Sequence, residues 1–129
     1  MSTINRFEDL EIWQMARDLV IEMDKIIKST NLKSDKGLTS QMRNAAISIK
    51  ANIAEGFERN GNKEFINFLF IAKASNGEFR SHLYSALDCK LIDKIQFDKQ
   101  YELSCRITGG ILKFIKYLKK SEIKGSRYL

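Results

Sequence analysis

The 129-residue sequence contains no proline and has only seven glycines, two cysteines, one histidine and one tryptophan. Proline and glycine are the residues that most often interrupt helices, so their scarcity favours long ones. Neither Cys89 nor Cys105 has a Cys or His neighbour at metal-ligand spacing, and no metal site is predicted. Both cysteines lie among apolar residues and are expected to be buried free thiols.

Long apolar runs are also absent. The longest, residues 65–72, is far too short to span a bilayer. The first twelve residues lack the basic start and apolar core of a signal peptide, so a cytoplasmic location is expected, without membrane association. The chain has 22 Lys and Arg against 16 Asp and Glu, a net charge of +6. That moderate excess permits an anionic partner such as RNA or DNA.

What the sequence does contain is helical periodicity. Apolar residues recur at three- and four-residue steps over about residues 8–29, 35–59, 62–90 and 95–120. Short polar connectors separate these segments, and Ser34, Asn62 and Asp93 stand where the last three helices could be capped. Residues 1–129 are therefore predicted to form a single all-α domain, an up-down-up-down antiparallel four-helix bundle.

One dipeptide complicates this prediction. Asn76-Gly77 is typical of a turn, but the apolar stripe keeps its phase from Ala72 to Phe79, so one continuous helix with a local weak point is predicted. In the last helix the expected core stripe is Phe97, Tyr101, Cys105, Thr108, Leu112 and Ile115.

The helix over residues 35–59 carries a polar stripe beside its apolar one, formed by Ser48, Asn52, Glu55 and Arg59. One interpretation is an oligomer interface, to which Phe65 and Phe68 in the apolar segment 65–71 would add. The other is a solvated face with an i,i+4 pair between Glu55 and Arg59, the apolar segment being covered by neighbouring helices.

Basic residues accumulate toward the C-terminus. The candidates for phosphate contacts are Arg106, Lys113, Lys116, Lys119 and Lys120, and Tyr117 beside them could stack on a base. The alternative is that these cations serve only solubility and the helix dipole.

No enzyme is predicted. His82 and Glu78 could form a base–carboxylate pair, but no nucleophile is placed with them. A glycine-rich phosphate loop and the Glu-x-x-His pairs of di-iron bundles are both missing from the sequence, and no cofactor is expected.

Four stretches resemble one known family. The segment SQMRNAAISIKANIAEG, residues 40–56, is similar to the signature of the four-helix-bundle proteins encoded in intervening sequences of bacterial 23S rRNA genes, also called the S23 family. Phe7, Asp9, Leu10 and Trp13 match that family's F-x-D-L-x-x-W opening. The run from Glu64 to Ser75 matches its E-F-x-x-F-L-x-x-A-x-x-S pattern, and Gly110, Leu112 and Leu118 lie in a similar last helix.

The resemblance implies a four-helix bundle that forms a homopentamer. It also implies a fold similar to the accessory protein of diversity-generating retroelements, a basic pentamer that binds nucleic acid and a reverse transcriptase. It carries no catalytic residues over to this chain. The sequence thus favours a non-enzymatic, homo-oligomeric bundle that binds RNA or DNA, and the alternative is a protein-interaction scaffold with no nucleic-acid role.

Overall fold

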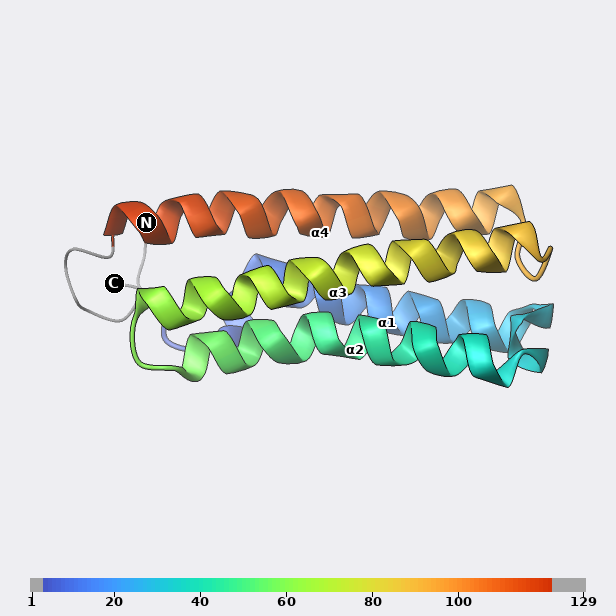
Figure 1. Cartoon of the computed structure of the whole chain (residues 1–129), viewed down its shortest axis with the longest axis horizontal. Coiled ribbons are helices and arrows are strands. Elements are labelled where there is room, and N and C mark those ends of the chain that lie inside the picture. The colour runs from blue at the N-terminus through green and yellow to red at the C-terminus, as the bar shows by residue number, and fades with distance from the viewer. Residues whose placement is uncertain (1–3, 122–129) are drawn as a thin grey trace.

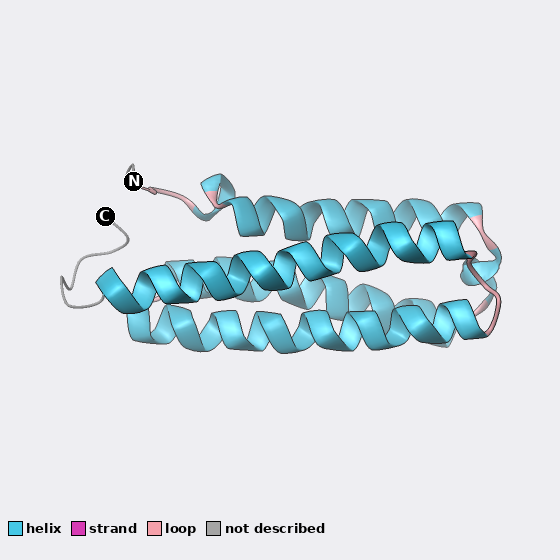
Figure 2. Cartoon of the chain, turned by 90° about the horizontal axis from the view of Figure 1, so that it is seen from above, coloured by secondary structure: helices cyan, strands magenta, loops and turns pink. Residues whose placement is uncertain are grey.

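The computed structural model describes residues 4–121. Four helices make up the bundle: α1 (Glu11–Ser29), α2 (Lys36–Glu58), α3 (Asn62–Asp88) and α4 (Lys94–Ser121). Short 3-10 turns at Phe7–Asp9 and Asn31–Ser34 precede α1 and α2. Each helix runs antiparallel to the one before it, and α4 packs against both α3 and α1 (Figures 1 and 2). The predicted all-α, up-down-up-down bundle is confirmed.

The helix ends show which residues stop and start each element. Asp35, rather than the predicted Ser34, caps α2, because its Oδ1 accepts the Leu38 amide at 2.9 Å. Gly61 adopts a φ of +115° in the tight connection to α3, a backbone that favours glycine. Asp93 caps α4 as predicted, and Gln96 returns a hydrogen bond to the Asp93 amide.

Asn62 does not cap α3 as predicted. It is the first residue of the helix, it is buried, and its side-chain amide donates to the Leu118 carbonyl oxygen at 3.0 Å and to Ser121 Oγ at 3.2 Å. The start of α3 is thereby tied to the end of α4.

The α2–α3 pair approaches closely near the loop that joins it. A Cβ atom placed on Gly56 would lie 2.7 Å from Phe65 Cδ1 and 2.8 Å from Phe68 Cβ. Phe65 is fully buried, with edge contacts to Phe57 and Phe114. The absent side chain at Gly56 is therefore what allows α3 to pack so tightly against α2.

The single helix predicted through Asn76-Gly77 is confirmed, and a polar cluster between α3 and α4 explains it. Asn76 has no exposed surface, and its amide donates to the Ser104 carbonyl and to Thr108 Oγ1, both at 2.8 Å. Ser104 Oγ donates to Asn76 Oδ1, and Arg80 donates to both hydroxyls at 3.1 Å. A buried amide with its partners satisfied stabilises the position that the dipeptide would weaken.

The core stripe of α4 differs from the predicted one. Its buried residues are Phe97, Gln100, Ser104, Ile107, Ile111, Ile115 and Leu118. Cys105 and Leu112 are exposed, and Cys89 at the end of α3 is exposed as well, so the prediction of buried thiols was wrong. The sequence pattern misled because two polar residues, Gln100 and Ser104, occupy core positions in this helix.

Candidate nucleic-acid interface

Arg106, Lys113, Lys116 and Lys120 form one exposed face of α4, which we call the basic face. Arg106, Lys113 and Lys120 are seven residues apart, close to two helical turns, and Lys116 lies three residues beyond Lys113. These positions point away from the buried residues of the same helix. Lys119 is also exposed, but it lies about 100° around the helix from its neighbour Lys120 and outside the basic face.

The cations of the basic face form no ion pair within the described residues, although Asp9 and Glu11 line one pocket with Lys113. Between Glu102 and Ser121 the sequence contains no carboxylate side chain. Within residues 4–121, none of the salt bridges involves Arg106 or the lysines of the basic face. Ion pairs within the described residues therefore do not neutralise these cations.

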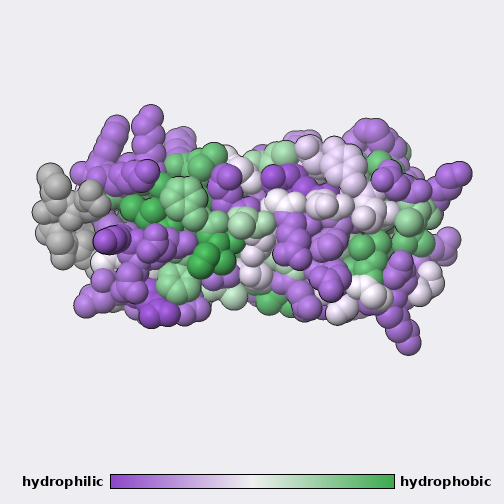
Figure 3. All heavy atoms as spheres, in the orientation of Figure 1, coloured by the Kyte–Doolittle hydropathy of each residue, from purple (hydrophilic) through white to green (hydrophobic). Residues whose placement is uncertain are grey.

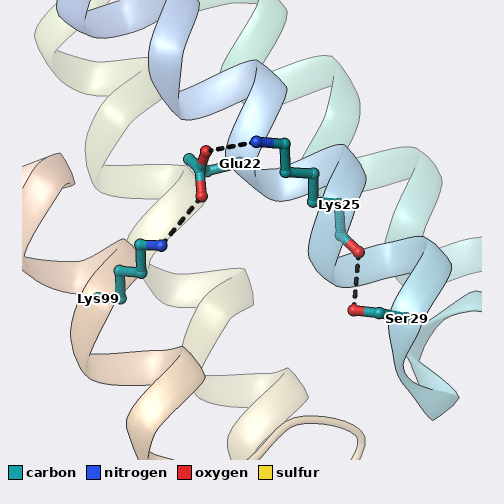
Figure 4. A network of polar contacts seen from close by, with 4 residues as sticks. All are labelled: Glu22, Lys25, Ser29 and Lys99. Carbon is teal, nitrogen blue, oxygen red and sulfur yellow. Dashed lines mark hydrogen bonds and ion pairs between the residues drawn. The ribbon is translucent and has the colours of Figure 1, made fainter.

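The first half of α4 is different. Lys99 Nζ lies 3.2 Å from Glu22 of α1, which also contacts Lys25 at 3.3 Å, as Figure 4 shows. The hydrogen bond from Lys99, followed by that from Lys25, lowers the pKa of Glu22 from its ordinary value. Lys94 pairs with Asp98 at 2.6 Å. The uncompensated charge of α4 is therefore confined to the half that follows Glu102.

A mainly apolar pocket of about 400 Å³ adjoins the basic face, and we call it the end pocket. One wall is the chain that leads into α1, and the other is α4. The lining residues are Ile4, Asp9, Leu10, Glu11, Ile12, Gly110, Lys113, Phe114 and Tyr117. Lys113 thus belongs to both the basic face and the end pocket.

Helical spacing builds the α4 wall of the end pocket. Gly110, Lys113, Phe114 and Tyr117 recur at steps of three, one and three residues, and therefore share one side of the helix. The rings of Phe114 and Tyr117 are stacked, with centroids 5.7 Å apart and planes inclined by 19°. A Cβ atom on Gly110 would lie 2.9 Å from Ile12 Cγ2, so the missing side chain lets α4 approach α1 beside the pocket.

The polar stripe of α2 is hydrogen-bonded within the chain. Ser48 Oγ lies 2.9 Å from Ser75 Oγ of α3, and the Asn52 amide donates to the Ser48 carbonyl at 2.8 Å and to Ser48 Oγ at 3.0 Å. Arg59 pairs with Glu55 at 2.8 Å, as predicted for an i,i+4 pair. The first two residues of the stripe thus help to join α2 to α3 in the monomer.

The two aromatic residues predicted for the interface differ in accessibility. Phe65 has no exposed surface and belongs to the monomer core. Phe68 is half-buried, with the Arg59 guanidinium 4.8 Å from its ring centroid. More apolar surface is offered by Phe70, Ile71 and Leu112, which are 45%, 48% and 45% exposed. Figure 3 shows hydrophobic atoms gathered over the first half of α3 and the adjoining part of α4.

His82 and Glu78 form a pair on α3, with 3.4 Å between Nε2 and Oε2. Within residues 4–121, no three His, Cys, Asp or Glu side chains are arranged to hold a metal ion. In the same part of the chain, no helix is both long and apolar enough to cross a membrane.

Fold and surface together define a class: a basic, all-α four-helix bundle whose last helix carries, along its second half, exposed cations that form no salt bridge within the described residues. Within that class the chain belongs to the 23S rRNA-intervening sequence protein family, whose model matches residues 8–122. The bundle is also similar to the crystal structure of a protein of unknown function from the S23 ribosomal protein family of Bacteroides thetaiotaomicron. That similarity has a TM-score of 0.74 at 21% sequence identity and covers 81% of this chain and 98% of the other, which shows the shared fold. No curated protein matches the chain.

Sequence reasoning found the cations of the basic face but not the end pocket. The pocket joins residues about 100 positions apart, 4–12 and 110–117, and periodicity within one helix cannot reveal such a pairing. The signal that the sequence did offer was Gly110, because a glycine on the packing side of a helix allows a neighbouring helix to come close.

Proposed function

We propose that this chain is a non-enzymatic, homo-oligomeric bundle in the cytoplasm that binds RNA or DNA through the basic face of α4. The observation that carries the proposal is the basic face itself: exposed cations on one side of one helix, none of which forms a salt bridge within residues 4–121. Along an α-helix, seven residues rise about 10.5 Å. Arg106, Lys113 and Lys120 therefore space their charges over about 21 Å, long enough to follow several phosphates of a strand.

Phosphate is the ligand that such a face suits. Binding of cationic side chains to a polyanion releases condensed counter-ions, and this release drives association without sequence preference. Solubility alone would be served by charges of both signs, as on the first half of α4, where Lys99 and Lys94 have acidic partners. The second half of α4 instead gathers cations that form no salt bridge within residues 4–121, and this segregation supports the functional interpretation.

Self-association completes the proposal. The resemblance to the S23 family implies a homopentamer, and a closed ring would present one basic face per subunit. Several weak phosphate-binding faces on one particle bind a single strand more tightly than one face can, because each later contact is intramolecular.

A second candidate function is a protein-interaction scaffold. It is favoured by the exposed apolar side chains of Phe70, Ile71 and Leu112, each of which leaves almost half of its surface to solvent. Exposed groups of large apolar side chains are typical of surfaces that bind another protein or another copy of the same chain.

Neutralising the basic face tests the first proposal. In the triple variant Lys113→Gln, Lys116→Gln, Lys120→Gln, we expect a large loss of affinity for a short single-stranded RNA at low salt. The slope of log K against log salt should also become shallower by about 2, since each lost phosphate contact on a single strand contributes about 0.7. Fluorescence anisotropy at several salt concentrations measures both quantities, and light scattering reports whether the oligomer stays intact.

A matched control removes the same charge elsewhere. Lys28, Lys33 and Lys36 are exposed, belong to none of the salt bridges within residues 4–121, and lie around the α1–α2 connection, at the other end of the bundle (Figure 1). Their replacement by Gln should change the salt slope much less. Equal effects of the two triple variants, or no binding by the wild type, would refute the basic face as the binding surface. An intact oligomer indifferent to RNA would favour the scaffold.

A further inference from the structure

The end pocket lies against the basic face, and Lys113 contributes to both. Its volume of about 400 Å³ falls within the range of pockets that bind small organic groups, roughly 300–1,000 Å³. Its lining is mainly aliphatic and aromatic, with polar groups at Asp9, Glu11 and Lys113. An apolar slot beside a row of phosphate-binding cations is the arrangement that a flat, aromatic nucleobase attached to a charged backbone would need.

We infer that the end pocket takes one unstacked base of a single-stranded nucleic acid whose phosphates lie along the basic face. This inference rests on the proposed function and deepens it, because it specifies a single strand rather than a duplex. A base in a duplex is stacked on both sides and paired along its edge, and cannot enter a pocket between two helices. Proteins that bind single strands combine a cationic track with aromatic side chains in this way.

The aromatic part of the pocket is preorganised. Tyr117 stacks on Phe114, and the Phe114 ring in turn makes an edge contact with the buried Phe65 at 5.4 Å between centroids. The Tyr117 ring is consequently supported from the core and has little freedom to lose when a base packs beside it. Low entropic cost is one reason why rigid aromatic side chains serve as binding platforms.

The polar groups of the pocket indicate which base edge it accepts. Ionised carboxylates accept hydrogen bonds and cannot donate them, so Asp9 and Glu11 suit a base with an exocyclic amino group. Asp9 forms a salt bridge with Arg6, with 3.8 Å between Oδ1 and Nε. Glu11, in contrast, has no hydrogen-bond or ion-pair partner within residues 4–121. Glu11 also stands in the first turn of α1, where the helix dipole stabilises its charge. The pocket should therefore prefer cytosine, which has an amino group, over uracil, which has a carbonyl oxygen at the same position.

The test compares three single strands of equal charge and adds a duplex. Anisotropy titrations of the full chain at low salt would use four labelled ten-nucleotide DNA probes: oligo-dC, oligo-dU, an oligomer with abasic sites throughout, and a duplex. We expect oligo-dC to bind tightest, and the abasic oligomer to bind about tenfold or more weakly, since one base–aromatic stacking contact is worth roughly that factor. Salt dependence should be similar for the three single strands, because they carry the same phosphates.

Variants assign the effect to the pocket. Tyr117→Leu should reduce the affinity for oligo-dC to that of the abasic oligomer without changing the latter, whereas Tyr117→Phe should retain it. Glu11→Gln should remove the preference for cytosine over uracil. Lys116→Gln is the control from the basic face outside the pocket, and it should weaken all single strands equally. Circular dichroism melts confirm that each variant is folded.

The outcomes separate the two proposals. Salt-dependent binding in which oligo-dC and the abasic oligomer are equal, or in which Tyr117→Leu has no effect, overturns the base pocket and leaves the basic face standing. Tighter binding of the duplex than of oligo-dC also overturns it. The absence of binding to any probe refutes the proposed function itself.

Discussion

Gly56→Ala is the substitution that most directly tests the packing of the bundle. The added Cβ would lie 2.7 Å from Phe65 Cδ1 and 2.8 Å from Phe68 Cβ, whereas comfortable carbon–carbon contacts are about 3.5–4.0 Å. Neither neighbour can yield easily, because Phe65 is enclosed by Phe57 and Phe114 and the Phe68 atom adjoins the α3 backbone. The helices would have to separate by several tenths of an ångström.

The magnitude follows from two opposing terms. Replacing glycine by alanine inside a helix gains about 1 kcal/mol of helix propensity, and less in the last turn, where Gly56 lies. Overpacking a tight core costs about 1–3 kcal/mol, and two violated contacts with immobile neighbours place this case near the upper value. We expect a net loss of about 2 kcal/mol in the free energy of unfolding.

Gly109→Ala is the matched control. Gly109 is an exposed glycine in the middle of α4, and nothing lies within 4 Å of the position that its Cβ would occupy. The same chemical change should therefore stabilise the protein by up to about 1 kcal/mol. Urea unfolding followed by circular dichroism measures both variants. If Gly56→Ala proved as stable as Gly109→Ala, the close approach of α2 and α3 at this glycine would be refuted.

Three more variants probe buried polarity and charge. Gln100→Met removes a buried amide whose Nε2 and Oε1 both have no hydrogen-bond partner within residues 4–121, so a gain of about 1–2 kcal/mol is expected in urea unfolding; a loss would mean that the amide is satisfied. Asn76→Ala leaves the Ser104 carbonyl and hydroxyl without their buried partner and should cost about 2–3 kcal/mol, and an unchanged melting temperature would contradict the structure. The pKa of Glu22 is lowered, chiefly by the hydrogen bond from Lys99. The contribution of Glu22 to the free energy of unfolding is therefore fully present above the unfolded carboxyl pKa of 4.5, and it is lost as the pH falls through the lower folded pKa. In Glu22→Gln the free energy of unfolding should therefore fall less steeply with decreasing pH below 4.5. The same pH dependence in both proteins would disprove the contribution of Glu22.

The sequence predicted the four helices well, because their apolar periodicity is long and uninterrupted by proline. The bounds of α2 (Lys36–Glu58) and α4 (Lys94–Ser121) lie within a residue of those expected. At α1 the difference is larger, since the chain forms a 3-10 turn at Phe7–Asp9 before the helix begins at Glu11. A propensity cannot distinguish a first helical turn from a 3-10 turn that precedes it.

Side-chain burial was less predictable than the helices. In α4, apolar residues fall on two overlapping stripes that share Phe97 and Ile115, and hydrophobicity favoured the one with Cys105 and Leu112. The other stripe is the buried one, and its Ser104 meets Asn76 of α3 in a long-range polar contact that no local pattern encodes. The cations of the basic face could be found from spacing alone, but their lack of acidic partners depends on neighbouring helices.

The cluster around Asn76 has a consequence for how α3 and α4 are aligned. A seam made only of Leu and Ala could slide by one turn, about 5.4 Å, and still bury almost the same apolar area. Here such a shift would carry the Asn76 amide away from Ser104 and Thr108 and leave it buried without a partner. A single polar residue in a helical interface specifies register in this way, at some cost in stability. The buried amide thus fixes the longitudinal register of the last two helices, and with it the height along the bundle at which α4 presents its cations.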